Sequence, residues 1–320
     1  MTYSIITPVY NRADCISRCI DSVCAQLTFK DINIEHIIVD DASTDTTASI
    51  IKTYVNQFQH IKFISFNENR GTNAARNAAI RMAKGEFCIL LDSDDYFVHN
   101  ALQIINETIN LYPKYKYYLF APDDKMTFFN TNPSLKDINE KELTYIDFLA
   151  EKVNTDYIHV CTTDIMKKYP FDESLRIYEG VFFLRFYKEA QKIFFKKEIV
   201  AIRERSRDDS VTRSVLRIEK TSISKSIKSS SLFIEWFKKD YINNHLMNRF
   251  QFLLNSIFQN QVLLGNYKEA QNALKEINKY NLEINYKFLI LYLLRLGGVT
   301  RILLRYYLII KYNLLHKKLR

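Results

Sequence analysis

The sequence predicts an α/β fold: a mostly parallel, doubly wound sheet with helices on both faces, followed by an α-helical region. Two observations support this prediction. Short apolar segments alternate with helical patterns through the N-terminal half of the chain, which is typical of parallel strands joined by crossover helices. After residue 214, glycine and proline nearly disappear and apolar residues recur at helical spacing. We therefore expect one domain over residues 1–214 and a helical region over residues 215–320.

The expected strands are short, apolar and followed by polar residues. They lie at residues 4–7, 35–39, 61–64, 87–91 and 199–202. Pro8 is expected to end the first strand, because proline has no amide N–H to contribute to a sheet. The expected helices cover residues 13–26, 43–58, 72–84 and 181–190. Gly85 stands where a C-cap glycine would end the third of these helices, and residues 114–160 show the least regular pattern.

Polar clusters follow three of the expected strands. They are Thr7-Pro8-Val9-Tyr10-Asn11, Asp40-Asp41 and Asp92-Ser93-Asp94. The carboxyl ends of parallel strands meet at one edge of a sheet, and ligands bind at that edge in doubly wound folds. The three clusters therefore define a candidate ligand site.

The cluster Asp92-Ser93-Asp94-Asp95 carries the most chemistry, because it follows a strand that should be buried. Clustered carboxylates repel and raise one another's pKa, and a bound divalent cation relieves that repulsion. In an extended segment Asp92 and Asp94 lie on the same side, so both can reach one Mg²⁺ or Mn²⁺ ion. The alternative is a polar turn before the next helix, with Asp95 as a helix cap.

The glycine spacing excludes two common nucleotide-binding loops. The chain has six glycines, and none forms a Gly-x-Gly-x-x-Gly fingerprint or a Walker loop. A nucleotide diphosphate at this edge would therefore need a metal to neutralise its phosphates. The five cysteines form no Cys-x-x-Cys pair, so reduced thiols are expected. No apolar run reaches the ~18 residues of a transmembrane helix.

Charge is distributed unevenly along the chain. Residues 215–320 contain 18 Lys and Arg against 6 Asp and Glu, whereas residues 1–214 contain 27 against 30. A basic helical region with interleaved leucine, isoleucine and tyrosine suits the headgroup layer of an anionic membrane. In the alternative, its apolar side chains pack within the helical region and its charges are solvated. No nucleic-acid-binding motif accompanies the positive charge, so no nucleic-acid partner is expected.

Four ordered motifs carry a resemblance to a known family. They are residues 6–11 (ITPVYN), 38–45 (IVDDASTD), 69–77 (NRGTNAARN) and 91–95 (LDSDD). In content, order and spacing they resemble the inverting family 2 glycosyltransferases of bacteria, which have the GT-A fold. The resemblance covers residues 3–214. It implies a nucleotide-sugar half over about residues 1–98 and an acceptor half over about residues 99–214.

The resemblance implies a set of donor-binding residues. In these motifs they are Pro8, Tyr10, Asn11, Asp40, Arg76, Asp92 and Ser93. Pro8 and Tyr10 would shape the pocket for the nucleotide base, and Asp40 would accept a hydrogen bond from the base. A purely structural role stays open for Pro8, as the end of a strand.

The same resemblance implies how the diphosphate is held. Arg76 would lie near the base and the phosphates, Asp92 would face the ribose or metal-bound water, and Asp94 would ligate Mn²⁺ or Mg²⁺. We take Asp94 and Asp92 as the metal-ligand candidates. The open alternative for Arg76 is an ion pair with an acidic residue of a neighbouring helix.

In the family that the chain resembles, a carboxylate deprotonates the acceptor hydroxyl, and no covalent intermediate is expected. That base usually lies in a Glu-Asp pair shortly after a Phe-Asp-Glu segment. Here the segment at residues 171–173 is present, but Glu179 is followed by Gly180 in place of the aspartate. We expect Glu179 to be the base, with Asp172 as a weaker candidate. In the alternative, Glu179 only caps the helix that follows it.

The segment after the last expected strand, residues 203–213, resembles the family's flexible loop that closes over the donor. Basic residues there would stabilise charge on the leaving diphosphate. Our candidates are Arg203, Arg205 and Ser210. None of the six histidines falls in this loop, where many relatives carry a further metal ligand, so the third ligand stays open.

We therefore expect a metal-dependent, inverting glycosyltransferase, transferring a hexose or N-acetylhexosamine. Its donor would be a nucleotide-sugar, UDP-linked, and its acceptor a glycan or lipid-linked oligosaccharide in the synthesis of a surface polysaccharide such as O-antigen or capsule. The expected location is cytoplasmic, peripheral on the inner face of the membrane, with the C-terminal region on the anionic lipid surface. Two alternatives stay open: a nucleotidyltransferase-like protein, and a nucleotide-sugar-binding protein without catalysis, which the glycine at position 180 would favour.

Overall fold

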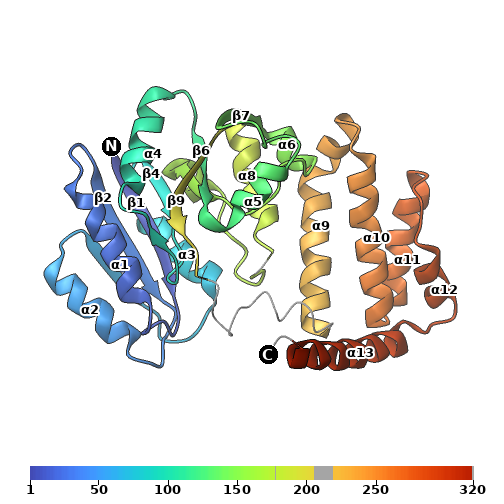
Figure 1. Cartoon of the computed structure of the whole chain (residues 1–320). Coiled ribbons are helices and arrows are strands. Elements are labelled where there is room, and N and C mark those ends of the chain that lie inside the picture. The colour runs from blue at the N-terminus through green and yellow to red at the C-terminus, as the bar shows by residue number, and fades with distance from the viewer. Residues whose placement is uncertain (177, 205–218, 319–320) are drawn as a thin grey trace. The chain divides into compact units, whose positions relative to one another are not determined.

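The computed structural model describes residues 1–176, 178–204 and 219–318 (Figure 1). Contacts divide the chain into two compact units, residues 1–206 and residues 207–320. The domain boundary expected at residue 214 lies outside the described residues.

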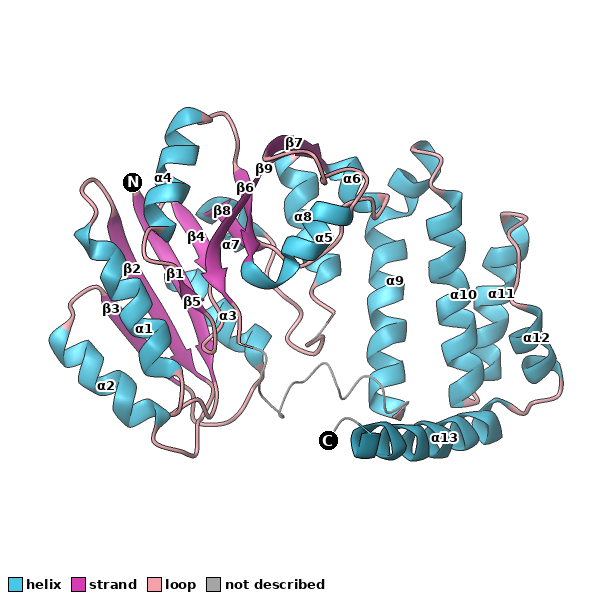
Figure 2. Ribbon diagram, in the orientation of Figure 1, coloured by secondary structure: helices cyan, strands magenta, loops and turns pink. Residues whose placement is uncertain are grey.

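The described part of the first unit is built on one sheet of nine strands (Figure 2). In spatial order these are β3 (Ile61–Ser65), β2 (Asn33–Asp40), β1 (Thr2–Val9), β4 (Phe87–Leu90), β8 (Ile158–Thr162), β6 (Tyr117–Pro122), β9 (Lys192–Ile202) and β5 (Tyr96–Phe97), and β7 (Glu140–Thr144) pairs with β9. Strands β1 to β4 run parallel, β8 runs antiparallel to β4 and β6, and β6 is parallel to β9. The expected fold class is confirmed, with a sheet that is mixed and mostly parallel.

Helices cover both faces of this sheet. In chain order they are α1 (Ile16–Cys24), α2 (Thr47–Gln57), α3 (Thr72–Met82), α4 (Ala101–Leu111), α5 (Met126–Thr131), α6 (Tyr145–Leu149), α7 (Thr163–Lys168) and α8 (Gly180–Ala190), with 3₁₀ turns η1 (Ala25–Thr28) and η2 (Asp123–Lys125). The chain moves from β1 outward to β3 through α1 and α2, and then returns through α3 to β4 on the other side of β1. Right-handed crossovers therefore place α3 on the face opposite to α1 and α2.

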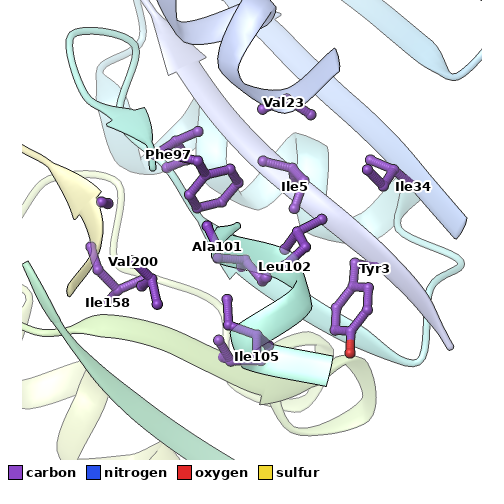
Figure 3. Close-up of a cluster of buried hydrophobic side chains, with 14 of the residues drawn as sticks. Tyr3, Ile5, Val23, Ile34, Phe97, Ala101, Leu102, Ile105, Ile158 and Val200 are labelled. Carbon is purple, nitrogen blue, oxygen red and sulfur yellow. The ribbon is translucent and has the colours of Figure 1, made fainter. Parts of the chain in front are cut away.

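One hydrophobic cluster joins the sheet to α1 and α4 (Figure 3). Ile5 of β1 meets Val23 of α1 on one side and Leu102 of α4 on the other, and all three side chains are fully buried. Burying a side chain of this size stabilises the fold by about 1.5–3 kcal/mol. The cluster holds the strands whose carboxyl ends carry the polar motifs.

Strand β1 continues through Pro8, where we had expected it to end. The amide of Leu91 donates to the carbonyl of Ile6, so the backbone polar groups of Ile6 point toward β4. By alternation along the strand, those of Pro8 point the same way. The last β1–β4 pair is Ile6 with Leu90. Pro8 thus lies beyond the end of that ladder, and its missing N–H costs no strand hydrogen bond.

Gly85 is not the left-handed C-cap that we expected, since α3 ends at Met82 and Gly85 has no positive φ. A Cβ atom at Gly85 would lie 2.7 Å from the backbone nitrogen of Ser4 and 2.9 Å from the carbonyl oxygen of Thr2. The glycine is required because the chain passes directly against β1 before entering β4.

The region of weakest pattern, residues 114–160, contains regular structure. Strand β6 lies near the start of this region, and all six of its residues are buried. Its sequence YYLFAP does not alternate between apolar and polar residues because both faces are covered. Helix α6 begins with a capping box, in which Thr144 and Asp147 each bind the other's backbone amide.

The second unit is helical, as expected. Its helices are α9 (Lys220–Asn243), α10 (Met247–Leu264), α11 (Tyr267–Lys279), α12 (Tyr286–Leu293) and α13 (Gly297–Lys318). Gly265 ends α10 in the left-handed conformation, and α11 begins two residues later. None of the helices in the described ranges combines the length and apolarity that crossing a bilayer requires.

Candidate active site

The carboxyl ends of five strands bring the polar motifs to one edge of the sheet. Because β1, β2, β4, β6 and β9 all point the same way, the residues that follow them lie at this edge. Those residues are Tyr10 and Asn11, Asp41, the cluster 92–95, Asp123 and Asp124, and Arg203 and Glu204. We call this edge the acidic rim.

The motif after β1 is only partly accessible. Pro8 is buried within the strand, whereas the Tyr10 side chain is 40% exposed and can offer an aromatic surface. Asn11 adopts a positive φ of 50°, and its Oδ1 accepts the backbone N–H of Thr44 at 2.8 Å. Asn11 therefore holds the loop after β2 in addition to its expected donor role.

The Asp40-Asp41 pair is used to build the rim. Asp40 is 1% exposed, and its carboxylate accepts the amide of Ser43 at 3.1 Å and the hydroxyl of Ser65 at 3.2 Å. Each carboxylate oxygen keeps a further lone pair that a nucleobase N–H could use. Asp41 accepts the backbone amides of Arg70 and Gly71 at 2.6 and 2.7 Å, which fixes the loop before α3.

The cluster 92–95 holds three carboxylates in different surroundings. The side chains of Asp92 and Asp94 are 40% and 27% exposed, whereas Ser93 and Asp95 are buried. Burial, followed by the charges of Asp92 and Asp94, raises the pKa of Asp95 to about 7. Asp95 does not cap α4, whose N-cap is Asn100.

Arg76 of α3 connects this cluster to the expected base. Its Nη2 donates to Asp92 Oδ1 at 2.8 Å, and its Nη1 lies 3.5 Å from Glu179 Oε1. The Arg76 side chain is 12% exposed. Burial alone would lower its pKa, but Asp92 and Glu179 raise the pKa overall, so the guanidinium stays charged. Arg76 thus occupies the ion pair that sequence reasoning left as its alternative role, and both its partners are residues expected at the site.

Glu179 precedes the first turn of α8 without capping it. It occupies the N-cap position, but its side chain makes no cap hydrogen bond and is directed to Arg76. Asp172, the weaker candidate, accepts the amide and hydroxyl of Ser174 in a local turn. A Cβ at Gly180 would meet nothing within 4 Å, so the backbone does not require the glycine that replaces the family's aspartate.

Arg203 lies among carboxylates at the end of β9. Its guanidinium is 3.5 Å from Asp95, 3.9 Å from Asp124 and 3.2 Å from Asp156. Burial would lower its pKa, but Asp95 and Asp156 raise it. Arg203 is therefore a fixed positive charge beside the cluster 92–95. Arg205 and Ser210 lie outside the described residues.

A third arginine, Arg18 of α1, joins the loop after β4 to the chain beyond β9. Its Nη2 donates to the carbonyl oxygen of Asp94 and to Glu204, both at 3.1 Å, and its guanidinium stacks on Tyr96 at 4.5 Å. We had not assigned Arg18, Glu204, Asp124 or Asp156 to the site. A lone Arg in an amphipathic helix gives no sequence signal for such a contact.

The donor atoms of the rim suit a hard divalent cation. Asp92 and Asp94 are partly exposed carboxylates. The pKa of Asp95 is raised first by burial and then by the negative charges of Asp92 and Asp94. Within the described ranges, no three His, Cys, Asp or Glu side chains form a ready metal cage. The two partly exposed carboxylates suit Mg²⁺ or Mn²⁺, which often bind one or two carboxylates together with substrate phosphates.

Comparisons with known proteins give matches in sequence and in fold. The sequence profile of Glycosyl transferase family 2 matches residues 4–170. The chain is 43% identical over 103 residues to a poly(ribitol-phosphate) beta-glucosyltransferase of Bacillus spizizenii, covering 32% of this chain and 16% of that protein. It is 28% identical over 212 residues to a GalNAc(5)-diNAcBac-PP-undecaprenol beta-1,3-glucosyltransferase of Campylobacter jejuni, covering 65% and 66%.

Among solved structures, TarS residues 1–349 of Staphylococcus aureus, in complex with UDP, aligns with a TM-score of 0.56. The alignment is 22% identical and covers 81% of each chain. The chain spans less than two thirds of the length of the curated relatives named above.

Proposed function

The chain belongs to glycosyl transferase family 2, and from that premise we propose that it transfers a sugar from a UDP-linked donor to a hydroxyl of a surface glycan. The observation that carries the proposal is the position of Arg76. This one side chain pairs both with Asp92 of the donor motif and with Glu179, the candidate base. The carboxylate of the donor motif and the carboxylate of the candidate base therefore both contact one guanidinium.

The proposed donor site lies on the acidic rim, over the ends of β1, β2 and β4. Tyr10 offers the exposed aromatic surface for the base, and Asp40 accepts a hydrogen bond from the base in addition to those from Ser43 and Ser65. Asp92 and Asp94 would hold Mg²⁺ or Mn²⁺, which when bound neutralises the diphosphate and assists its departure. Arg203, already charged and beside the cluster, adds a second positive charge for the leaving group.

In the proposed reaction Glu179 accepts the proton of the acceptor hydroxyl as the oxygen attacks the anomeric carbon. The bond from that carbon to the diphosphate breaks on the opposite side, so the configuration inverts and no sugar is attached to the enzyme. Arg76 holds the Glu179 carboxylate toward the Asp92 side of the rim. General-base catalysis of this kind contributes about 10²–10⁴ to the rate.

The proposed acceptor is carried on a lipid or is a polymer of the cell surface, such as O-antigen or capsule. Support comes from relatives named for poly(ribitol-phosphate) and for a PP-undecaprenol-linked glycan. A lipid-linked acceptor places the reaction at a membrane, and we propose that the second unit contacts the anionic inner leaflet there.

The exposed surface of α12 and α13 supports this membrane contact. Large hydrophobic side chains are exposed along it: Tyr286, Ile290, Leu293, Leu294, Leu296, Val299, Ile302, Leu303, Tyr306, Tyr307 and Ile310. Lys287, Arg295, Arg305 and Lys311 lie exposed among them, and no acidic residue follows Glu283 in the sequence. We call this set the basic apolar surface. Apolar side chains interleaved with cations suit the headgroup layer of anionic lipid.

The first test is calorimetric titration of UDP and of GDP into the full chain, with Mn²⁺ and with EDTA. We expect UDP to bind with Mn²⁺, to bind at least tenfold more weakly with EDTA, and to lose the metal effect in Asp94→Ala. A preference for GDP would change the donor and keep the reaction. Absence of binding by either nucleotide would contradict the donor site.

Turnover is then measured as UDP release from UDP-glucose, UDP-galactose and UDP-N-acetylglucosamine. The two alternatives predict different results. A binding protein without catalysis would bind UDP and release none from any UDP-sugar with any acceptor, and a nucleotidyltransferase would release pyrophosphate from a nucleoside triphosphate.

A further inference from the structure

We propose that Asn73 and Asn77 of α3 are positioning residues that set the place of Glu179. The inference rests on the proposed function, in which Glu179 is the base. It concerns two buried amides that the donor and metal chemistry do not use.

Asn77 is costly in the middle of α3, and Asn73 lies buried in its first turn. Asparagine is among the weaker helix formers, because its side chain competes for backbone hydrogen bonds. Asn73 and Asn77 lie inside the Ala-rich helix α3 and are 1% and 4% exposed. A buried amide is tolerated only when its polar atoms are paired, so their partners reveal what the residues are for.

Apart from Arg76, whose Nη1 lies 3.5 Å from Asn73 Oδ1, those partners lie about a hundred residues further along the chain, on the segment that leads to the base. Asn77 Nδ2 donates to the carbonyl of Phe171 at 2.8 Å, and Asn77 Oδ1 accepts the amide of Phe171 at 2.9 Å. Asn73 Nδ2 donates to the carbonyls of Asp172 and Leu175 at 3.0 and 3.3 Å. The two side-chain amides thus bind backbone groups of residues 171–175 that would otherwise need partners in a strand or helix.

Arg76 completes the array from the same face of the helix. Positions 73, 76 and 77 are spaced i, i+3 and i+4, so their side chains project together. The two amides hold the backbone of residues 171–175, and Arg76 holds the Glu179 side chain while it pairs with Asp92. The amide of Tyr178 donates to the carbonyl of Leu175, which links the held segment to Glu179.

The consequence is that α3 links the donor motif to the segment that leads to the base. A base displaced by about 1 Å loses on the order of 10²-fold in rate. UDP is proposed to bind at the rim, and none of the donor-binding candidates lies in residues 171–175. Loss of either amide should therefore lower kcat and leave UDP affinity in place.

The experiment compares Asn73→Ala and Asn77→Ala with the wild-type full chain. Alanine favours the helix, so α3 itself is retained. UDP release is followed with the UDP-sugar that the wild type turns over fastest, and UDP affinity is measured by calorimetry. We expect kcat to fall about 10–100-fold, with the Kd for UDP and the KM for the UDP-sugar within about twofold of wild type.

A double-mutant cycle with Glu179→Gln separates positioning from general damage. If the amides act through Glu179, Asn77→Ala should lower kcat about 10–100-fold in the wild type and less than twofold in the Glu179→Gln background. Multiplicative losses in the two backgrounds would overturn the inference. So would a wild-type kcat in both asparagine variants, or a loss of UDP binding equal to the loss of kcat.

Asn255 of α10 supplies a matched control. It is also a buried helix asparagine that holds a distant segment, through the carbonyl of Glu283 at 2.9 Å and the amide of Asn285 at 3.1 Å. Asn255→Ala should lower stability and leave kcat unchanged. If Glu179→Gln retains full activity, the base assignment fails together with this inference. If only the asparagine variants are fully active, the proposed function stands and the inference fails.

Discussion

At the scale of single residues, the proposed chemistry depends on how Glu179 is held at the start of α8. Its side chain is 19% exposed and forms an ion pair with Arg76. This largely buried ion pair keeps the base oriented, and the second carboxylate oxygen stays available to accept a proton. The glycine that follows it is unobstructed.

The first prediction concerns this pair of positions. Glu179→Gln should lower kcat by about 10²–10⁴, because the amide cannot accept the acceptor's proton, while UDP affinity stays within twofold. UDP release and calorimetry measure the two quantities. Gly180→Asp is the companion variant, since it introduces the family's carboxylate into open space.

We expect Gly180→Asp to fold normally and to remain dependent on Glu179. Activity restored in the double variant Glu179→Gln, Gly180→Asp would move the base to position 180. That result would show that an aspartate at position 180 can act as the base.

A second prediction concerns a buried histidine at the sheet. His36 Nε2 lies 2.9 Å from the hydroxyl of Thr7, and burial lowers the pKa of His36 to about 3. The unfolded chain takes up a proton near pH 6.5 and the folded chain does not, so stability is complete above pH 6.5 and falls as the pH decreases toward 3. At pH 5 the loss from this residue is about 2 kcal/mol.

Hydrogen exchange of the β1 and β2 amides, corrected for intrinsic rates, measures this loss between pH 7 and pH 5. His36→Gln should make the slope shallower by about 1.4 kcal/mol per pH unit, whatever its effect on stability at pH 7. His99→Gln, which replaces an exposed histidine, is the control and should leave the slope unchanged. An unchanged slope in His36→Gln would contradict the assignment.

At the scale of elements, the close approach of Gly85 to β1 gives a third prediction. Gly85→Ala would place a methyl group 2.7 Å from the backbone nitrogen of Ser4, and backbone cannot move aside cheaply. We expect a loss of about 1–3 kcal/mol, measured by thermal unfolding. Gly180→Ala, with open space around the new methyl, should change stability by less than about 1 kcal/mol. Equal effects of the two substitutions would exclude the steric explanation.

The elements that the sequence predicted best are those with a regular hydrophobic period. Strands β1 to β4 and helices α1 to α3 follow the expected alternation, with ends shifted by a few residues. Strand β6 was missed because it is buried on both faces and has no period of two. Pro8 was misinterpreted because its effect depends on where the neighbouring strand ends, which is a property of the sheet.

The candidate site was predictable in location more than in contacts. Motif order placed Asp40, Asp92, Asp94 and Glu179 in one family pattern, and parallel strands explain why the first three share an edge. The sequence does not reveal that Asp40 is enclosed by Ser43 and Ser65, because hydrogen bonds between loops have no local period. Asn77 of α3 did leave a signal, as a costly residue in the middle of a helix.

At the scale of the whole molecule, charge separates the two ends of the sequence. Residues 1–214 carry 27 basic and 30 acidic residues, whereas residues 215–320 carry 18 and 6. Because residues 1–214 are nearly neutral, they repel the proposed anionic donor little. The basic residues 215–320 attract an anionic surface over a distance of about 10 Å at moderate salt. The proposed membrane contact therefore depends on the basic apolar surface.

The last prediction tests that surface. The full chain should co-sediment with vesicles of phosphatidylcholine and phosphatidylglycerol, bind vesicles of phosphatidylcholine alone at least tenfold more weakly, and lose affinity as salt rises. Arg305→Glu with Lys311→Glu should weaken binding to the anionic vesicles at least tenfold, since each basic side chain near such a surface contributes about 1 kcal/mol. Leu303→Ser should weaken it further by removing an apolar contact.

The matched control reverses two exposed lysines of α11, Lys268→Glu with Lys275→Glu. It makes the same change in net charge on a helix outside the basic apolar surface, so a specific contact predicts that binding falls by less than threefold. Equal loss in the two pairs would mean that net charge alone attracts the chain to lipid. Unchanged binding after Arg305→Glu with Lys311→Glu would exclude α13 as the contact, because a surface that binds anionic lipid through its cations cannot tolerate four units of added negative charge.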